Sequence, residues 1–298
     1  MHSPDYLFNE INRLGRKEVI EQLHKLYIIS ERSYRKRILE ILNKLKDIDH
    51  FDLIENYFIS EEDPDVRIEA ANLLASNYKE TKATRPLIWV LENEPTNEIK
   101  YIALKLLVEL GYREEQLKKT VEILKKDLRS QSDSVKIEAA KSLGLLEVKS
   151  AVKDLIESLN TYNKRVRIQV IETLGILKDE RAIHVLIPFL STTSQDLWTT
   201  NFNALKNILE EKFPLLLIQI LKETDDSVGH GFIRLGIIKA LRKLNDKKAI
   251  LPLIDLLEDH YYWVRWEAVK ALDDLEPDWR KEYENILREK STIIKEQQ

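Results

Sequence analysis

Residues 164–187, KRVRIQVIETLGILKDERAIHVLI, align without a gap with residues 231–254, GFIRLGIIKALRKLNDKKAILPLI. Both stretches contain an apolar residue followed directly by an arginine, which in the first stretch is the pair Val166-Arg167. Self-similarity at a fixed spacing is the sequence signature of a repeat protein. The chain is therefore expected to consist of copies of one structural unit.

The same opening pair recurs along nearly the whole chain. The residues that open the units are Tyr34, Val66, Ile99, Val135, Val166, Leu197, Ile233 and Val264. Their spacings are 32, 33, 36, 31, 31, 36 and 31 residues, which predicts eight units.

Each unit has the pattern of two helices, an A helix followed by a B helix. In the fifth unit we expect the A helix near Lys149–Leu159 and the B helix near Lys164–Leu177. Apolar residues in this B helix fall on one face of a 3.6-residue period; they are Val166, Val170, Ile171, Leu174 and Leu177. Polar turns such as EEDPD (61–65) and STTSQD (191–196) separate the helices and can cap them.

A helix pair of this size cannot bury its own apolar stripe, so neighbouring pairs must stack. The expected fold is all-α, an α-solenoid (superhelix) of about eight two-helix repeats. Small residues would let successive helices approach closely; they are Ala70, Ala71, Ala139, Ala140, Ala240, Ala268 and Ala271.

We expect a single domain over 1–298, with repeats over 17–276 and short helical caps at both ends. The N-terminal cap would be 1–16, and a capping helix and tail would occupy 277–298. The C-terminal cap would close the last repeat through four apolar or aromatic side chains, which are Trp279, Tyr283, Ile286 and Leu287.

Composition agrees with an all-helical chain. Gly and Pro total 7 and 8 of 298 residues, about 5%, against roughly 12% in an average protein. The absence of Cys excludes disulfides and thiolate chemistry. With 47 basic and 51 acidic residues the net charge is −4, which disfavours a general nucleic-acid binder. The start of the chain lacks a secretory h-region and no apolar run reaches membrane-spanning length, so a cytoplasmic location is expected.

The recurring string D-x-x-V-R-x-x-A-x-x-A-L-G-x-L resembles the HEAT-repeat superfamily, in its short bacterial and archaeal form, also called the phycobilisome-lyase type. The residues that carry the resemblance are Asp65, Val66, Arg67, Ala70 and Leu74; Val135, Ala139, Leu143 and Gly144; Val166, Arg167, Leu174 and Gly175; and Val264, Arg265, Ala268 and Leu272. It covers about 32–276. The resemblance implies a superhelix with the B helices on its concave side, and a protein-binding or scaffolding role.

The resemblance says little about activity. The di-iron hydroxylase of the superfamily implies paired His-Glu dipeptides, and this chain has none. The bilin lyases of the superfamily offer no short motif to place here. Gly-rich phosphate loops, GxSxG and HExxH motifs are also missing from the sequence. We therefore nominate no catalytic, cofactor-binding or metal-ligating residue.

A column of cations follows the opening residue of each unit. It consists of Arg35, Arg67, Lys100, Lys136, Arg167, Arg234 and Arg265, with Trp198 in the one remaining place. We expect a structural ladder with acids six residues earlier, as in the pairs Glu61/Arg67, Glu94/Lys100 and Asp259/Arg265; an open basic surface is the alternative.

A second column, five residues further along each unit, contains lysines that include Lys105, Lys141, Lys239 and Lys270. A solvated face with i,i+3 pairs explains it, and a groove that attracts an acidic protein segment is the functional alternative. The dense basic stretch 31–46 is explained by solvation, with phosphate contact left open.

The C-terminal third contains the other candidates. Trp198 is expected to pack between units or to anchor a partner. The turn at 223–232, with His230 between two glycines, is about five residues longer than its peers and is expected to be a surface loop. Trp263 is expected to be exposed, and Trp266, which shares a column with Ile168, is expected in the core.

The first hypothesis is a non-enzymatic scaffold or adaptor that binds another protein, one with an acidic segment, along the B-helix face and the C-terminal repeats. The candidate partner-binding residues are Lys105, Lys141, Trp198, His230, Lys239, Trp263 and Lys270. The alternative is a bilin-lyase-type enzyme or enzyme subunit that acts on a chromophore-bearing protein. A third is nucleic-acid binding through the basic columns, and no small-molecule substrate or membrane partner is expected.

We predict that Leu174→Asp unfolds the repeat array, because the register places this side chain in the core and an unpaired buried charge is strongly unfavourable. Thermal unfolding followed by circular dichroism measures the effect. A melting temperature equal to that of the unmodified protein would contradict the register.

Overall fold

The computed structural model describes residues 3–78, 81–94, 96–225, 227–281 and 283–284, and the side chains of all of these except 81 and 97. The described residues form α-helices and short 3-10 helices, with no strand among them. The expected all-α fold is confirmed. The described helices include none with the length and apolar character that crossing a bilayer requires.

Contacts divide the chain into two compact units, Met1–Val148 and Lys149–Gln298. The single repeat domain expected over 1–298 therefore stays a prediction.

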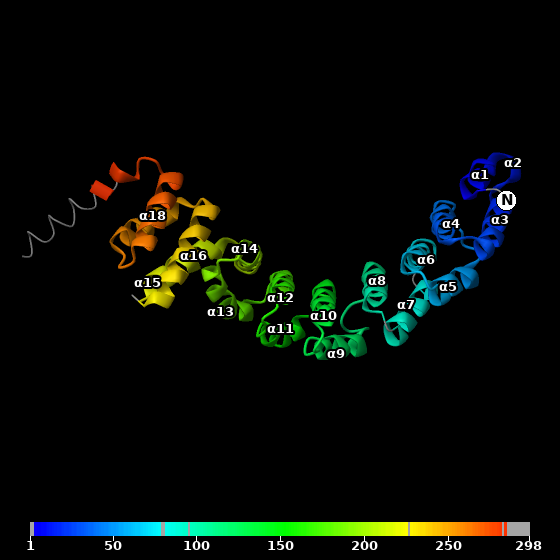
Figure 1. The fold of residues 1–298 in the computed structure, drawn as a ribbon, viewed down its shortest axis with the longest axis horizontal. Helices are drawn as coiled ribbons and strands as arrows, with labels where there is room; N and C mark the ends of the chain where they lie inside the picture. The colour runs from blue at the N-terminus through cyan, green and yellow to red at the C-terminus, as the bar shows by residue number, and fades with distance from the viewer. Residues whose placement is uncertain (1–2, 79–80, 95, 226, 282, 285–298) are drawn as a thin grey trace, which may run out of the picture. The chain divides into compact units, whose positions relative to one another are not determined.

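The first unit contains four helix pairs after a short lead-in (Figure 1). Its helices are α1 (Pro4–Asn9), α2 (Ile11–Leu14), α3 (Arg16–Ile29), α4 (Arg32–Lys44), α5 (Phe51–Ser60), α6 (Pro64–Asn77), α7 (Thr81–Asn93), α8 (Asn97–Glu109), α9 (Lys118–Asp127) and α10 (Asp133–Leu145). The B helices α4, α6, α8 and α10 pack one against the next in chain order. The lead-in helix α1 packs against α3 and α4, where Arg37 donates to Asp5.

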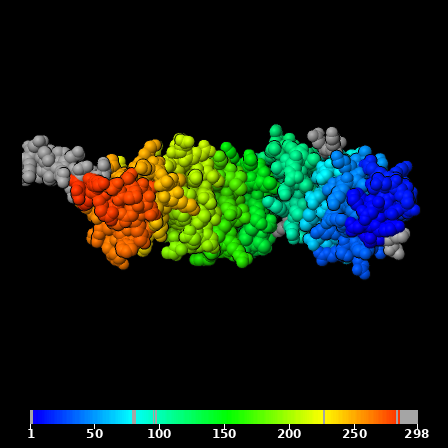
Figure 2. All heavy atoms as spheres, turned by 90° about the horizontal axis from the view of Figure 1, so that it is seen from above, coloured from blue at the N-terminus to red at the C-terminus, as the bar shows by residue number. Residues whose placement is uncertain are grey.

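The second unit also contains four pairs. Its elements are η1 (Lys149–Ala151), α11 (Val152–Ser158), α12 (Lys164–Leu177), η2 (Glu180–Ala182), α13 (Ile183–Leu186), η3 (Ile187–Ser191), α14 (Gln195–Leu209), η4 (Glu210–Lys212), α15 (Phe213–Glu223), α16 (Val228–Leu244), η5 (Lys247–Ala249), α17 (Ile250–Asp255), η6 (Leu256–Glu258) and α18 (Tyr262–Leu275). The B helix α12 packs on α14, and α16 packs on α18. In the space-filling view the colours of successive repeats within each unit lie side by side (Figure 2).

The eight described pairs agree with the eight repeats that the sequence predicts. The B helix expected over Lys164–Leu177 has those bounds, and its five predicted core residues are at most 2% exposed. The seven alanines expected between helices are all at most 1% exposed. Their small side chains let one B helix lie close to the next.

The A helix of the sixth repeat departs from the expected regular helix. It is broken into η2, α13 and η3, and Pro188 lies at the start of η3. Proline has no amide hydrogen to donate within an α-helix and its ring crowds the preceding turn, so the chain tightens into 3-10 geometry there.

The C-terminal cap is described only in part. Trp279 is buried and its indole Nε1 donates to Asp273 Oδ1 at 2.8 Å, and its ring lies 6.1 Å from that of Tyr283. The expected contacts of Ile286 and Leu287, with the rest of 285–298, lie outside the described residues, as do residues 1–2 of the N-terminal cap.

Two glycines of α16 test how closely this helix approaches η3. A Cβ at Gly236 would lie 2.0 Å from the carbonyl oxygen of Leu190 in η3, whereas a Cβ at Gly229 would meet nothing within 4 Å. We predict that Gly236→Ala lowers the free energy of unfolding by about 2 kcal/mol or more, because backbone must move apart. Gly229→Ala should raise it by about 0.5 kcal/mol, because alanine favours the helical backbone.

Urea unfolding of the two variants measures both effects. They share one helix and one chemical change, so equal effects would show that the approach of α16 to η3 is not the constraint.

Candidate functional site

Three arginines of the cation column form a ladder, and its rungs join successive repeats. Lys136 instead lies 3.8 Å from Asp133 of its own repeat. The three arginines pair with the acid in the turn of the following repeat: Arg35 with Glu61 at 3.0 Å, Arg67 with Glu94 at 2.6 Å and Arg234 with Asp259 at 2.6 Å. The pairs predicted within one repeat, Glu61/Arg67, Glu94/Lys100 and Asp259/Arg265, are wrong.

The reason for this register lies in the backbone. Arg67 and Arg265 each donate a hydrogen bond to a backbone carbonyl group near the end of the A helix of their own repeat, six to nine residues earlier in the chain. Arg67 Nε donates to the Phe58 carbonyl at 3.0 Å, and Arg265 donates to the Asp259 carbonyl at 2.7 Å. The acid of that turn is left to bind the arginine of the repeat before it.

Each acid also organises its own turn. Glu94 accepts a hydrogen bond from the Thr96 amide at 3.0 Å while it binds Arg67. Burial alone would raise the pKa of the Glu94 carboxyl, but the hydrogen bonds from Arg67 and Thr96 outweigh it and leave that pKa below its usual value. Glu61 follows the same logic with Tyr27 and Arg35, and its pKa is also lowered.

The ladder is interrupted in the second unit at Arg167. The next turn supplies no acid to this arginine, because Asp196 binds Lys164 at 2.7 Å, and the buried Nε of Arg167 has no hydrogen-bond partner among the described residues. The next place in the column is Trp198, which is 8% exposed and stacks on Phe202 at 5.3 Å. Burial of the indole favours the packing interpretation of Trp198.

The predicted exposures of Trp263 and Trp266 are both wrong, and the structure has them the other way round. Trp266 is 61% exposed, although it was expected in the core. Trp263, expected to be exposed, is half-buried between Phe232 at 6.1 Å and Tyr261 at 4.6 Å. The column that contains Trp266 is only half-buried even where it holds Ile168, and an indole is too large for that space.

The long surface loop expected at 223–232 is also wrong. Its second half forms the first turns of α16, which begins at Val228 with Ser227 as N-cap. His230 does not project freely, because its Nδ1 lies 2.6 Å from Asp225 Oδ1. Hydrogen bonds from Ser227 and His230 lower the pKa of Asp225 to about 2. The insertion therefore lengthens the helix and carries Phe232 to the side of Trp263.

The exposed side chains of α16 and α18 include a set that we call the C-terminal aromatic surface: Phe232, Tyr262 and Trp266, with Lys239 and Lys270. Phe232 and Tyr262 are 46% and 69% exposed. The ammonium group of Lys270 lies 4.8 Å from the centroid of the Trp266 ring. Trp263 supports the surface from behind, in contact with Phe232 and Tyr262.

A groove of about 270 Å³ crosses the same B helices. It is lined by Thr192, Thr193, Gln195, Trp198, Lys239, Arg242 and Glu267. Lys239 is exposed, and the described part of the chain offers it no hydrogen-bond or ion-pair partner. The structure thus brings Trp198 and Lys239 into one groove and places Trp263 and Lys270 on the neighbouring helix α18.

Lys105 and Lys141 belong to the first unit and are not part of this groove. Lys105 lies 4.0 Å from Glu109, and Lys141 lies 3.0 Å from Glu138, as ordinary pairs along one helix. Such pairs contribute only a few tenths of a kcal/mol. The solvated-face interpretation accounts for both.

The three arginines of the basic stretch 31–46 are paired with acids. Arg32 binds Asp63 and Asp65, and Arg37 binds Asp5 and Glu40. This pairing removes cations that phosphate contact would need.

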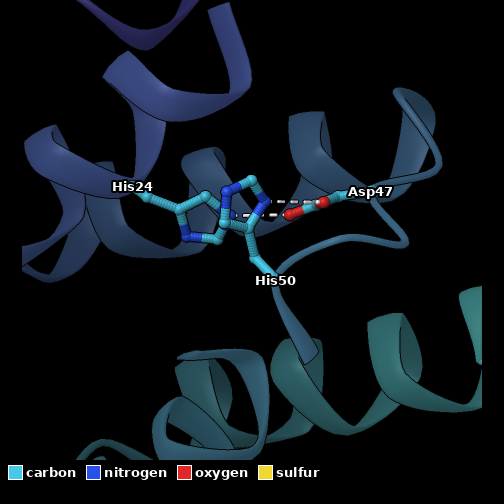
Figure 3. Close-up of side chains that lie close together, drawn as sticks. All are labelled: His24, Asp47 and His50. Atoms are coloured by element: carbon cyan, nitrogen blue, oxygen red, sulfur yellow. Dashed lines mark hydrogen bonds and ion pairs between the residues drawn. The ribbon is translucent and has the colours of Figure 1, made fainter. Parts of the chain in front are cut away.

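Sequence reasoning missed a cluster in the first repeat. His24, Asp47 and His50 come together with their ligating atoms within 4.8 Å of one another (Figure 3). The Asp-x-x-His spacing of 47 and 50 was the available signal, but His24 lies in a different helix and only the fold brings it there.

The fold defines an all-α helical-repeat protein. Residues 121–201 match the family model of HEAT repeats, and residues 233–259 match that of the PBS lyase HEAT-like repeat. These matches confirm the resemblance seen in the sequence pattern. No curated protein sequence matches the chain.

Three solved structures are similar to this chain at low identity. One is the complex of CpcE and CpcF of phycocyanin lyase from Nostoc sp. PCC7120, with 21% identity, 82% of this chain and 95% of that chain covered, and a TM-score of 0.42. The second is human deoxyhypusine hydroxylase in complex with glycerol, at 17% identity, 90% and 99% coverage and a TM-score of 0.35. The third is an engineered protein at 20% identity, 93% and 98% coverage and a TM-score of 0.20. No function follows from likenesses at this level.

The ladder generates a stability prediction. Arg67→Ala should lower the free energy of unfolding by about 3 kcal/mol, because it leaves the carboxylate of Glu94, which is 7% exposed, without its cation. Arg32→Ala is the matched control, because Arg32 also binds acids of the repeat that follows its own, while its side chain is 64% exposed. The control should change stability little.

Urea unfolding of both variants distinguishes the two cases. Equal losses would show that the buried rung contributes no more than a surface ion pair.

Proposed function

We propose that the chain is a protein-interaction scaffold that docks a partner protein on the C-terminal aromatic surface. The observation that carries the proposal is the exposed indole of Trp266, 61% accessible on a B helix, with the Lys270 ammonium over its ring. Exposed tryptophan and tyrosine side chains gathered in one patch are typical of binding hot spots.

The surface is built to be rigid. Phe232, Trp263 and Tyr261 form a continuous stack of rings, with centroids 6.1 and 4.6 Å apart, behind the exposed side chains. Packing on α16 and α18 fixes these rings before any partner arrives. A preformed surface loses little conformational freedom on binding, which favours affinity.

Charge favours an acidic segment in the partner. Lys239 and Lys270 are both exposed on this surface, and the half-buried Glu267 between them is accompanied by Arg242 at 3.7 Å and Lys270 at 4.0 Å. The surface therefore presents cations alongside aromatic rings. Opposite charge on the partner would speed association and align the two proteins.

A chromophore-bearing protein is the second candidate partner, with the chain as a bilin-lyase-type enzyme or subunit. The match to the PBS lyase HEAT-like repeat over 233–259 includes Lys239 and most of α16 and α17, which supports this candidate. A change in bilin absorbance on mixing with the purified protein would favour it; a simple scaffold leaves the spectrum unchanged. The cytoplasmic location expected from the sequence stays a prediction.

We expect Trp266→Ala to weaken partner binding by about 30-fold, in line with a central hot-spot tryptophan, without lowering the thermal midpoint. Lys239→Glu should also weaken binding, more strongly at low salt. Quantitative affinity capture from the native host, compared between variants at equal loading, measures the retained partner.

Leu251→Ala is the matched control for surface apolar area, because Leu251 is 55% exposed on the A helix α17 of the same repeat as Trp266. Its binding should equal that of the unmodified chain. Loss of the partner in all three variants, or in none, would count against the C-terminal aromatic surface. Trp198→Ala should instead lower the thermal midpoint, because it removes a buried ring.

A further inference from the structure

A second chemistry is present in the first repeat, where three ligating side chains converge from separate elements. His24 lies in the middle of α3, Asp47 lies in the turn after α4, and His50 is the N-cap of α5. His24 Nε2 lies 2.6 Å from Asp47 Oδ2, and His50 Nδ1 lies 3.0 Å from Asp47 Oδ1. Figure 3 shows both imidazole rings directed at the two oxygens of one carboxylate.

The backbone holds Asp47 in place. The end of α4 is a Schellman motif: Lys46 has a positive φ of 49°, its amide donates to the Asn43 carbonyl, and the Asp47 amide donates to the Leu42 carbonyl at 3.2 Å. The Asp49 amide then donates to Asp47 Oδ1 at 3.2 Å. The carboxylate is therefore positioned by its own turn and not by the two histidines alone.

The cluster is mostly buried. Asp47 is 1% exposed and His24 is 4% exposed, so both are removed from water. The side chain of His50 is 26% exposed and leaves a path from solvent. A buried carboxylate needs a positive or hydrogen-bonding partner, and a metal ion supplies the first.

We propose that His24, Asp47 and His50 form a binding site for one divalent first-row transition-metal ion. Two imidazole nitrogens and one carboxylate oxygen are a ligand set suited to Zn²⁺, Co²⁺ or Fe²⁺, with a further coordination position left for water. Ca²⁺ and Mg²⁺ prefer oxygen ligands throughout and fit this set poorly.

The spacing needs only a small adjustment. With bonds of about 2.0–2.1 Å, ligand atoms around a tetrahedral ion lie roughly 3.3 Å apart. One nitrogen from each histidine and one oxygen of Asp47 lie within 4.8 Å of one another. His24 Nε2 lies 2.6 Å from Asp47 Oδ2, and His50 Nδ1 lies 3.0 Å from the other oxygen, Oδ1. Side-chain rotations that narrow the widest of these separations would bring the three atoms to the tetrahedral spacing.

The ring nitrogens that do not ligate have suitable places for their protons. His24 Nδ1 lies 3.1 Å from the Tyr57 hydroxyl, which can accept its N–H when the ion takes Nε2. The partly exposed ring of His50 can carry its proton on Nε2. A neutral imidazole thus ligates by moving its own proton to the other nitrogen, and an imidazolium releases one proton.

Tyr57 is itself held firmly. Its ring stacks on that of Tyr27 at 3.8 Å, and the Tyr27 hydroxyl donates to Glu61 at 2.8 Å, next to the first rung of the ladder. The orienting partner of His24 is thus part of the packed interior. Loss of a residue that orients a metal ligand typically lowers metal affinity by about 10- to 100-fold.

The test is calorimetric titration of the chelator-treated full chain with ZnCl₂. We expect one equivalent of Zn²⁺ per chain and a thermal midpoint that rises with Zn²⁺ but not with the same concentration of Mg²⁺. His50→Ala should weaken binding by about 100-fold or more, and Tyr57→Phe by about tenfold. His184→Ala is the matched control: His184 is exposed on α13, outside the cluster, and its loss should leave the affinity unchanged.

Circular dichroism confirms that each variant folds; if His50→Ala does not, His50→Gln replaces it, because the amide keeps a hydrogen bond to Asp47 but is a poor ligand. Absence of a one-to-one Zn²⁺ complex would overturn the proposal. So would an affinity that is equal in the unmodified chain and the folded His50 variant, or one that falls as much in His184→Ala.

Discussion

Each helix pair has more apolar surface than it can cover by itself, and the stacking of one B helix on the next resolves this. In α12 the residues Val166, Val170, Ile171 and Leu174 have no exposed surface, although the opposite face of this helix is exposed to solvent. Alanines such as Ala139 and Ala140 keep successive B helices close. The core of each unit is therefore a row of shared contacts, and no repeat is stable without a neighbour.

The ladder adds direction to this row. Hydrophobic contact alone is tolerant of sliding, whereas a guanidinium that must reach an acid 25 to 27 residues ahead accepts one register. Because Glu94 binds both its own turn and the preceding Arg67, turn geometry and stacking are coupled. The turn that follows Arg167 offers this arginine no acid, and the buried Nε of Arg167 has no hydrogen-bond partner among the described residues. In the next repeat the column holds Trp198 in place of a cation, and its buried ring contributes packing there.

Binding chemistry lies where the repeats leave side chains uncovered or bring polar groups together. In α16 and α18 the stacking requirement is met by Trp263 and its neighbours, which leaves Trp266 and Tyr262 facing solvent. In the first repeat the turn between α4 and α5 places a carboxylate beside two imidazoles. Both features belong to the repeat geometry, and neither requires a loop or domain outside it.

The sequence by itself determined the all-α fold, the eight repeats, the bounds of α12 and the buried alanines, because helical periodicity and the spacing of the units are local patterns. It did not determine which partner each arginine takes, because residues six apart and residues about 26 apart are equally compatible with the pattern. The exposure of Trp266 depended on how much space the packed helices leave at that position, which is too little for an indole. The start of α16 depended on the hydrogen bonds among Ser227, Asp225 and His230. The meeting of His24 with Asp47 was decided only by tertiary structure, since the packing of α3 against the end of α4 brings together residues 23 apart in the chain.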